Sequence, residues 1–442
     1  MTVKANEVFN VLRKSILVDG FDIVIDMEKS EGSYIIDARN RRKFLDFYTF
    51  FASSPLGMNH PKLANEKFKE RVFRSAVNKI ANADIYTIEF AEWVDAVKNI
   101  AMPDYLPHLF QISGGALAVE SALKVAFDWK VKKNLKKGPD VIKGQKVLHF
   151  DHAFHGRTGY TMSLTHTVDP RKYQFFPKFD WPRIDPPIVK FPIEQNLAEI
   201  EKAEEKALDY IYSILEKDHE DIAAFIMEPI QSEGGDNFFR KEFFQELRKI
   251  CDKYDILLIF DEVQSGMGIT GKWWAHQHFD VKPDIMAFGK KMQICGIMAG
   301  KRIDEVENNA FVESSRINST FGGNIVDMVR ATRILEIIKE DNLIENARIK
   351  GEKLKKILQD IQKDFPDLVS NARGLGLMRS FDLPNTEIRK AFQKRCFEEN
   401  MLILPCGRKS IRFRPILCIE DRELELADEK IRLILKKMRR KE

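Results

Sequence analysis

The chain has 442 residues, 44% of them hydrophobic and 31% charged, so it can bury a substantial core and is long enough for more than one domain. Its 71 basic and 67 acidic residues leave a net charge of only +4, which excludes a broad basic surface for nucleic acid. Its five cysteines form no CxxC pair, and no apolar run has the length of a signal peptide or membrane span, so we expect a cytoplasmic protein with reduced thiols, no membrane segment and no structural metal.

The N-terminal segment has the pattern of a small unit rich in strands. Apolar residues recur at helical spacing over residues 6–17, which predicts a helix. Residues 21–26, 34–37 and 43–45 then have the pattern of short strands joined by turns.

From about residue 61 the pattern changes to alternating strands and helices. Strands are predicted at 108–112, 146–150, 222–227, 256–260 and 285–288. Because helical stretches separate them, we expect an α/β fold with a large, mostly parallel sheet covered on both faces. Residues 175–193 differ because they carry five prolines, which excludes a long helix or central strand and predicts an extended loop at the surface or active site.

The C-terminal part returns to a mixed pattern. Helices are predicted over 325–340 and 345–364, strands over 402–405 and 410–414, and an amphipathic helix from 421 to the end.

We expect two domains. Residues 1–60 and 325–442 would pack together as a small α+β domain, and residues 61–324 would form the large α/β domain.

Two groups that can carry chemistry stand near the middle of the chain. An apolar run over 256–260 ends at Asp261, and a second run over 284–288 is followed by Lys290 and Lys291. Ligands of open α/β sheets lie at the carboxyl ends of the strands, so Asp261 and a lysine would meet in one crevice. Pyridoxal phosphate requires such a pair, a lysine for its aldehyde and a carboxylate for its pyridine nitrogen. On spacing alone, a helix N-cap and two solvent-exposed lysines explain the same residues better.

The amino-acid sequence of this region resembles that of a known family. DEVQSGMGITG followed by KPDIMAFGKKMQ is similar to the motifs of the class III aminotransferases, and further motifs follow in the family's order over residues 34–415. The resemblance implies a fold type I transferase with pyridoxal 5′-phosphate as cofactor and a homodimer with shared active sites. It also implies that Lys290, directly after Phe-Gly, holds the cofactor, that Asp261 pairs with its pyridine nitrogen, that Val263 packs under its ring and that Gln264 binds its 3′-oxygen.

Other positions are assigned to the cofactor phosphate and ring. The sequence SGGA at 113–116 opens a helix after a strand, where backbone N–H groups can bind phosphate or a plain glycine turn can form. The family's motif is one residue shorter here, so only Gly115 and Ala116 are assigned to the phosphate. The resemblance places Phe154 over the ring and brings Thr320 to the phosphate of a neighbouring subunit, although the turn at 318–324 can equally be a helix N-cap.

Four residues are assigned to the substrates. The resemblance makes Arg157 a fork for a substrate carboxylate, where the alternative is a surface arginine. It sets Glu233, otherwise a solvated loop acid, against Arg412. Arg414 projects to the same side of a strand and is a rival partner, but Arg412 matches the family's arginine three residues before a proline. Asn318, in the turn at 318–324, is the fourth residue assigned to substrate binding.

Two segments, YTFFASSPLGMNHP and INSTFGGN, are most similar to the corresponding segments of family members that act on the ε-amino group of lysine. The implied reaction moves that group from L-lysine to 2-oxoglutarate, giving L-glutamate and 2-aminoadipate 6-semialdehyde, which cyclises to piperideine-6-carboxylate. Glu233 would cover Arg412 while lysine reacts and swing away for 2-oxoglutarate. Alternatives are an ornithine or 4-aminobutyrate aminotransferase, a cofactor-free binding protein on the same fold, or a metal enzyme using His152 and His155, which lack a matching Cys or Glu set.

Overall fold

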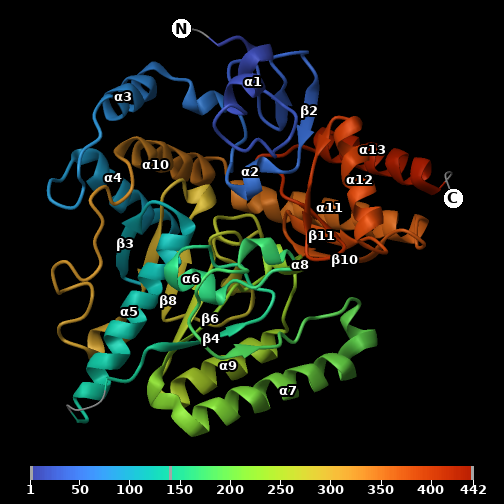
Figure 1. Cartoon of the computed structure of the whole chain (residues 1–442). Coiled ribbons are helices and arrows are strands. Elements are labelled where there is room, and N and C mark those ends of the chain that lie inside the picture. Colours follow the sequence, from blue (N-terminus) through green and yellow to red (C-terminus); the bar gives the residue numbers. More distant parts are fainter. Residues whose placement is uncertain (1–2, 139–141, 440–442) are drawn as a thin grey trace.

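The computed structural model describes residues 3–138 and 142–439, which contain three sheets (Figure 1). The largest has seven strands in the order β3-β9-β8-β7-β6-β4-β5. Its strands are β3 (His108–Ile112), β4 (Lys146–Phe150), β5 (Arg183–Ile184), β6 (Ile222–Met227), β7 (Leu257–Asp261), β8 (Ile285–Phe288) and β9 (Cys295–Ala299). All neighbouring strands from β8 to β5 are parallel, and only β9 runs antiparallel to its neighbours. The predicted large, mostly parallel sheet is therefore confirmed.

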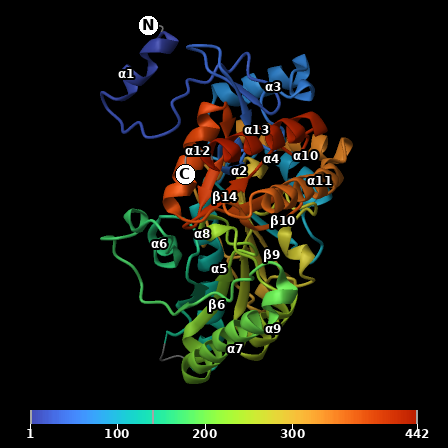
Figure 2. The same ribbon diagram turned by 90° about the vertical axis from the view of Figure 1, so that its right-hand side faces the viewer.

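Helices cover both faces of this sheet. Helix α5 (Gly115–Leu135) lies on one face, and α7 (Ile193–Asp218) and α9 (Lys241–Lys253) lie together on the other (Figures 1 and 2). Alternate residues of β7 supply the two cores: Leu257 and Ile259 pack with α5, whereas Leu258 and Phe260 pack with α7 and α9. A strand buried on both faces needs a continuous apolar run, which is why this sequence signal was clear.

The two ends of the chain share a sheet. Strands β1 (Tyr34–Ile36) and β2 (Lys43–Asp46) are joined by β12 (Met401–Leu402), which pairs in parallel with β2. A four-stranded sheet follows the order β10-β11-β14-β13, with β10 (Ser370–Leu375), β11 (Met378–Asp382), β13 (Leu404–Cys406) and β14 (Ser410–Phe413). We propose that residues 1–60 and 325–442 together form one domain and that residues 61–324 form the other.

The remaining helices surround these sheets. They are α1 (Val8–Leu12), α2 (Thr49–Ala52), α3 (Glu66–Val77), α4 (Ile88–Ala96), α6 (Gly159–Leu164), α8 (Ser232–Gly235), α10 (Ile325–Glu340), α11 (Leu343–Asp364), α12 (Thr386–Glu398) and α13 (Asp421–Arg439). The end of the predicted last helix, residues 440–442, lies outside the described residues. Within the described ranges, no helix has an apolar stretch long enough to cross a bilayer.

One N-terminal prediction is wrong and another is confirmed only in part. Residues 21–26 form no regular strand: one bridge joins Ile25 and Asp37, with hydrogen bonds from the Asp26 N–H to the Ile36 carbonyl at 2.8 Å and from the Ala38 N–H to the Val24 carbonyl at 2.7 Å. The apolar side chains of this segment pack against the small cluster that contains Phe44. The helix predicted over 6–17 is regular only from Val8 to Leu12 after a 3-10 turn. Its apolar stripe buries no residue within this chain, so packing does not support a longer helix.

Two other boundaries differ by less. Strand β7 extends one residue further than predicted and includes Asp261, because β8 continues the pairing as far as Ala287. The proline-rich segment 175–193 is irregular apart from β5, which occupies the edge of the sheet, where missing N–H donors are tolerated.

Helix α2 is a single left-handed turn. Its four residues have φ values of 44°, 53°, 60° and 64°. This left-handed conformation costs an L-residue roughly 1–2 kcal/mol of conformational free energy. Three contacts hold it: Asp46 Oδ1 accepts the N–H of Thr49 at 2.8 Å, Thr49 Oγ1 donates to the Arg414 carbonyl at 2.6 Å, and Lys291 Nζ donates to the Ala52 carbonyl at 3.2 Å. The turn therefore depends on two distant parts of the chain.

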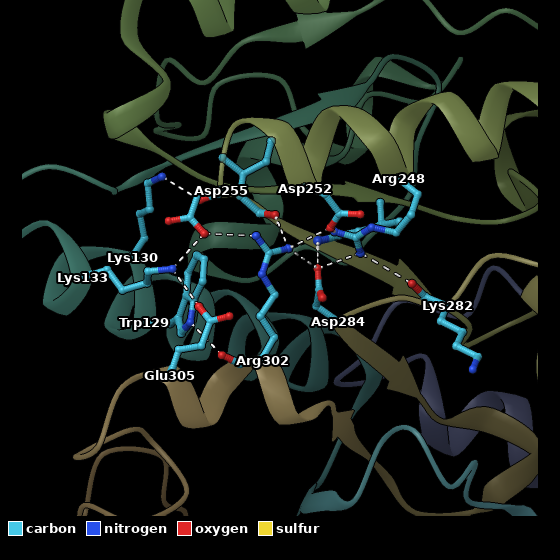
Figure 3. Close-up of polar contacts among 12 residues, drawn as sticks. Trp129, Lys130, Lys133, Arg248, Asp252, Asp255, Lys282, Asp284, Arg302 and Glu305 are labelled. Carbon is cyan, nitrogen blue, oxygen red and sulfur yellow. Dashed lines mark hydrogen bonds and ion pairs between the residues drawn. The ribbon is translucent and has the colours of Figure 1, made fainter.

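A charged network fastens the amino ends of the central strands (Figure 3). Asp284, just before β8, accepts hydrogen bonds from the Leu258 N–H at 2.7 Å and from Arg248 and Arg302 at 2.9 and 3.3 Å. Arg302 also donates to the Ile256 carbonyl at 3.0 Å. These contacts lie at the opposite ends of the strands from Asp261, so we assign them to stability.

Replacing Asp284 with alanine is expected to lower the free energy of unfolding by about 2–3 kcal/mol, because two arginines and one backbone N–H lose an acceptor together. The matched control is Asp252→Ala. Asp252 belongs to the same network, but its side chain is 62% exposed, so we expect a loss below about 1 kcal/mol. Urea denaturation of both variants measures the difference, and equal losses would contradict the assignment.

Candidate active site

A cavity of about 410 Å³ opens at the carboxyl ends of the parallel strands. Its lining contains eight of the residues assigned from the sequence, namely Gly115, Ala116, Phe154, Arg157, Asp261, Val263, Gln264 and Lys290. Asp261 is the last residue of β7 and Lys290 follows the neighbouring parallel strand β8. The two groups therefore meet at one sheet edge, as strand order requires.

Lys290 and Lys291 have different surroundings. Lys290 lines the cavity and has a φ of 47°, a strained conformation of the kind found at functional sites. Burial, with a further contribution from the nearby Arg412 charge, lowers the pKa of Lys290 to about 7. Lys291 instead donates to the carbonyls of Ala52 and Gln264 at 3.2 and 2.8 Å. Lys290 is therefore free for chemistry, whereas Lys291 supports the left-handed turn.

The lowered pKa makes a testable prediction for the cofactor-free protein. Half of the Lys290 side chains should carry a neutral, nucleophilic amine near pH 7, whereas an ordinary lysine reaches that point only near pH 10.5. Competitive acylation at several pH values, read by peptide mass spectrometry, should give a midpoint for Lys290 about three pH units below that of exposed lysines. A midpoint near pH 10 would contradict the prediction.

Asp261 is held from behind by a histidine. His155 Nδ1–H donates to Asp261 Oδ2 at 2.8 Å, and the Val263 N–H donates to Oδ1 at 3.0 Å. Both carboxylate oxygens are thereby oriented, and Asp261 is only 5% exposed. A buried, oriented carboxylate on the cavity wall can stabilise a positive charge within the cavity.

Glu228 is a residue whose role the sequence did not reveal. It is buried at the end of β6 and accepts the N–H groups of Phe154 and Ser232 at 2.9 and 3.1 Å. Burial raises the pKa of Glu228 to about 7. Its position directly after a buried strand, like that of Asp261, was the available signal. Glu228 thus fixes both the loop of Phe154 and the start of α8.

The first turn of α5 forms the end of the cavity suited to a phosphate. Its N-cap, Gly114, has a φ of 105° and makes no side-chain capping bond, so the first N–H groups of this 21-residue helix remain available. A Cβ on Gly115 would lie 3.0 Å from Val263 Cγ1, so the backbone approaches the cavity closely. An anion-binding helix start, an oriented carboxylate, an amine of low pKa and an apolar lining that includes Phe154 and Val263 fit pyridoxal phosphate.

Arg157 stands at the mouth of this cavity. It is exposed and makes no hydrogen bond or ion pair with any of the described residues. The loop that carries it is fixed by Glu120, whose Oε1 accepts from Thr158 Oγ1 at 2.7 Å and from the Tyr160 N–H at 3.0 Å. Arg157 also borders an adjoining cavity of about 510 Å³. Its guanidinium is thus available for a carboxylate that enters from solvent.

Arg412 and Arg414 face different acids. Arg412 Nη2 donates to Glu233 Oε2 at 2.8 Å, and its Nη1 donates to Gln264 Oε1 at 3.1 Å. Arg414 instead pairs with Asp236 at 2.5 Å. The contact predicted between Glu233 and Arg412 is therefore present. Although burial alone would raise it, the pKa of Glu233 is held below its usual value by Arg412 and Lys172.

Asn318 and Thr320 do not join the others. Both are exposed in the turn before α10, and neither lines the cavity of its own chain. The role assigned to Thr320, in the site of a neighbouring subunit, stays a prediction. Among the described residues, no group of three or more His, Cys, Asp or Glu side chains is placed to hold a metal ion.

Comparison with known proteins identifies the family. Residues 18–435 match the family described as aminotransferase class III. The chain is 48% identical to an L-lysine-epsilon aminotransferase of Mycobacterium tuberculosis over 431 residues, covering 97% of this chain and 95% of that protein. It is 32% identical to a mitochondrial 4-aminobutyrate aminotransferase of Homo sapiens, covering 90% and 82%.

A solved structure of lysine aminotransferase from M. tuberculosis superimposes with a TM-score of 0.96 at 46% identity, covering 98% of this chain and 99% of that one. The likeness therefore extends over both the cavity and the small sheets. The cofactor expected from the resemblance and from the shape of the cavity is also that of the family. The chain thus belongs to the class III aminotransferases, which are pyridoxal-phosphate-dependent enzymes of fold type I.

Proposed function

We propose that this enzyme transfers the ε-amino group of L-lysine to 2-oxoglutarate, giving L-glutamate and 2-aminoadipate 6-semialdehyde. The observation that carries the proposal is that two arginines, Arg157 and Arg412, differ in whether an acid pairs with them. Arg157 makes no hydrogen bond or ion pair with the other described residues, whereas Arg412 is covered by Glu233. The name of the M. tuberculosis relative, at 48% identity, supports lysine over the 4-aminobutyrate named for the relative at 32%.

The residues around the cavity have separate proposed roles toward the cofactor. Pyridoxal phosphate, when bound, supplies an electron sink for the carbon that carries the transferred nitrogen. Lys290 would hold the cofactor and then move a proton at that carbon, as a base and acid of matched pKa. Asp261 would pair with the pyridine nitrogen. The other contacts fall to Gly115 and Ala116 at the phosphate, Phe154 and Val263 on the two ring faces, and Gln264 at the 3′-oxygen.

Two unlike substrates must fit the same pocket. Lysine that enters by its ε-amine brings a carboxylate only at its far end, where Arg157 would receive it. 2-Oxoglutarate has a carboxylate at the far end and a second one beside its keto group, and this second one needs Arg412. A buried arginine without a partner is strongly unfavourable, so we propose that Glu233 covers Arg412 while lysine reacts.

Replacing Glu233 with alanine is expected to reduce the preference for the ε-amine over the α-amine of lysine by about tenfold or more, because the uncovered Arg412 then attracts the lysine α-carboxylate to the reacting end. Lysine labelled at one nitrogen or the other measures this ratio. Glu233→Gln, which keeps the shape without the charge, should have an intermediate effect. An unchanged ratio in the alanine variant would rule out the covering role.

A homodimer is part of the proposal. Large apolar side chains are exposed on several segments outside the domain cores, including Phe73, Val77, Ile85, Tyr86, Ile88 and Phe321. Phe321 belongs to the same turn as Asn318 and Thr320, and its carbonyl accepts a hydrogen bond from Asn82 at 2.7 Å. We propose that a second copy covers this surface, so that Thr320 reaches the partner's cofactor phosphate and Asn318 borders its substrate.

The deciding experiment follows one nitrogen atom. The purified, cofactor-loaded enzyme is supplied with 2-oxoglutarate and L-lysine that carries heavy nitrogen only at the ε position, and the glutamate is weighed by mass spectrometry. Heavy glutamate is the expected result. Light glutamate would mean transfer from the α-amine, and an absence of glutamate would favour ornithine or 4-aminobutyrate as the donor.

A further inference from the structure

Glu233 has a second cationic partner. Its Oε1 accepts from Lys172 Nζ at 2.5 Å, while its Oε2 accepts from Arg412 Nη2 at 2.8 Å. The three groups therefore form a row in which one carboxylate bridges two cations. Nothing in the reaction proposed above uses Lys172.

The two cations differ in burial and in origin. The Arg412 side chain is 2% exposed at the inner end of the row, whereas those of Glu233 and Lys172 are 23% and 27% exposed. Arg412 comes from β14, and Lys172 ends a 3-10 turn, Pro170–Lys172, that follows α6. A carboxylate leaving Arg412 toward the opening would therefore stay beside Lys172.

The position of Glu233 is fixed independently of Lys172. Helix α8, which carries Glu233, begins at Ser232, and Glu228 accepts the Ser232 N–H. The same Glu228 accepts the N–H of Phe154, over whose ring Lys172 Nζ lies at 5.8 Å from the centroid. Lys172 thus stands between the proposed ring contact and the acid, and Glu233 is already paired with it before it leaves Arg412.

We propose that Lys172 is a positioning residue that keeps Glu233 paired after the inner carboxylate of a 2-oxo acid displaces it from Arg412. With Glu233 on Arg412, loss of Lys172 would leave the acid its buried arginine partner. With Arg412 occupied by substrate, the same loss would leave a half-buried carboxylate without a cation. Lys172 therefore favours the open arrangement and sets affinity for dicarboxylates. This inference rests on the proposed function.

Two unreactive probes separate the arrangements in the cofactor-loaded enzyme. Glutarate needs both Arg157 and Arg412, whereas pentanoate has one carboxylate and needs only Arg157. We expect Lys172→Met to weaken glutarate binding about tenfold by calorimetry and to change pentanoate binding less than about twofold. The KM for 2-oxoglutarate should rise in step, with kcat/KM for lysine nearly unchanged.

Two further variants control for charge and for the loop. Lys172→Arg keeps a cation and should restore most of the glutarate affinity. Lys178 lies on the same segment, but its Nζ donates to the Tyr173 carbonyl and makes no hydrogen bond with Glu233. Lys178→Met should therefore bind glutarate as the wild type does. A loss of both probes in Lys172→Met would make Lys172 a direct carboxylate ligand and overturn the inference. Unchanged or tighter glutarate binding would overturn it as well.

The proposed function is tested first and separately. A wild-type enzyme that makes no heavy glutamate from ε-labelled lysine fails that test before any variant is compared, and the inference falls with it. A wild type that passes, together with a Lys172→Met variant of unchanged glutarate affinity, overturns the role of Lys172 alone.

Discussion

Lys290→Ala should lower kcat by at least about 10⁴-fold, the largest effect expected of any single change in this chain. The substitution removes the amine that we propose both holds the cofactor and moves the proton at the substrate carbon. The adjacent Lys291 is not expected to replace it, because its Nζ already donates to the carbonyls of Ala52 and Gln264. Turnover with lysine and 2-oxoglutarate measures the loss, and the absorbance of the bound cofactor should change with it.

Rescue by a small amine distinguishes lost chemistry from lost structure. Truncation to alanine leaves space beside the cavity, so added methylamine should restore part of the proton-transfer rate in proportion to its free-base concentration. The melting temperature should stay within a few degrees of the wild type, because Lys290 makes no ion pair with the other described residues. Activity within tenfold of the wild type would exclude Lys290 as the catalytic amine.

Asp261→Asn is expected to lower the rate about 10²- to 10³-fold, the usual cost of removing one oriented charged group from a site shielded from water. The amide keeps the size of the side chain, but its single oxygen can accept from only one of the two donors, His155 and Val263. The negative charge that would keep a pyridine nitrogen protonated is lost. Both half-reactions should slow by similar factors, since both use the same cofactor nitrogen.

The spectrum gives this second variant an independent test. In the wild type the Asp261 carboxylate should keep the pyridine nitrogen of the bound cofactor protonated, and the absorbance should report that state. In Asp261→Asn the pyridine nitrogen should lose its proton, and the absorbance should shift even without substrate. If rate and spectrum are both unchanged, Asp261 does not contact the ring nitrogen.

The sequence predicted the central features well because they follow from burial. Strands such as β6 and β7 are continuous apolar runs, and a run of that kind is hard to accommodate outside a buried parallel sheet. Strand order then brings Asp261 and Lys290 to one edge. The choice between Lys290 and Lys291 relied on the resemblance, and the different contacts of the two lysines now give it a physical reason.

Other features could not be read from the sequence because tertiary contacts decide them. The contact of Lys172 with Glu233 joins residues 61 positions apart, on a 3-10 turn and on a four-residue helix that are too short to show a periodic pattern. The spacing of His152 and His155 gave no sign that His155 donates to Asp261. The left-handed turn of α2 contains no glycine, so local propensity gave no sign of it.

The pairing of β12 with β2 has a consequence for the order of events during synthesis. The N-terminal strands emerge from the ribosome first, yet their partner, Met401–Leu402, emerges among the last residues. Asp261 and Lys290 can already lie together in a nascent chain whose central sheet has formed, since domains fold as units during translation. Arg412 follows β12, so a chain stalled before this point would hold the pair proposed for catalysis without the arginine proposed to distinguish the two substrates.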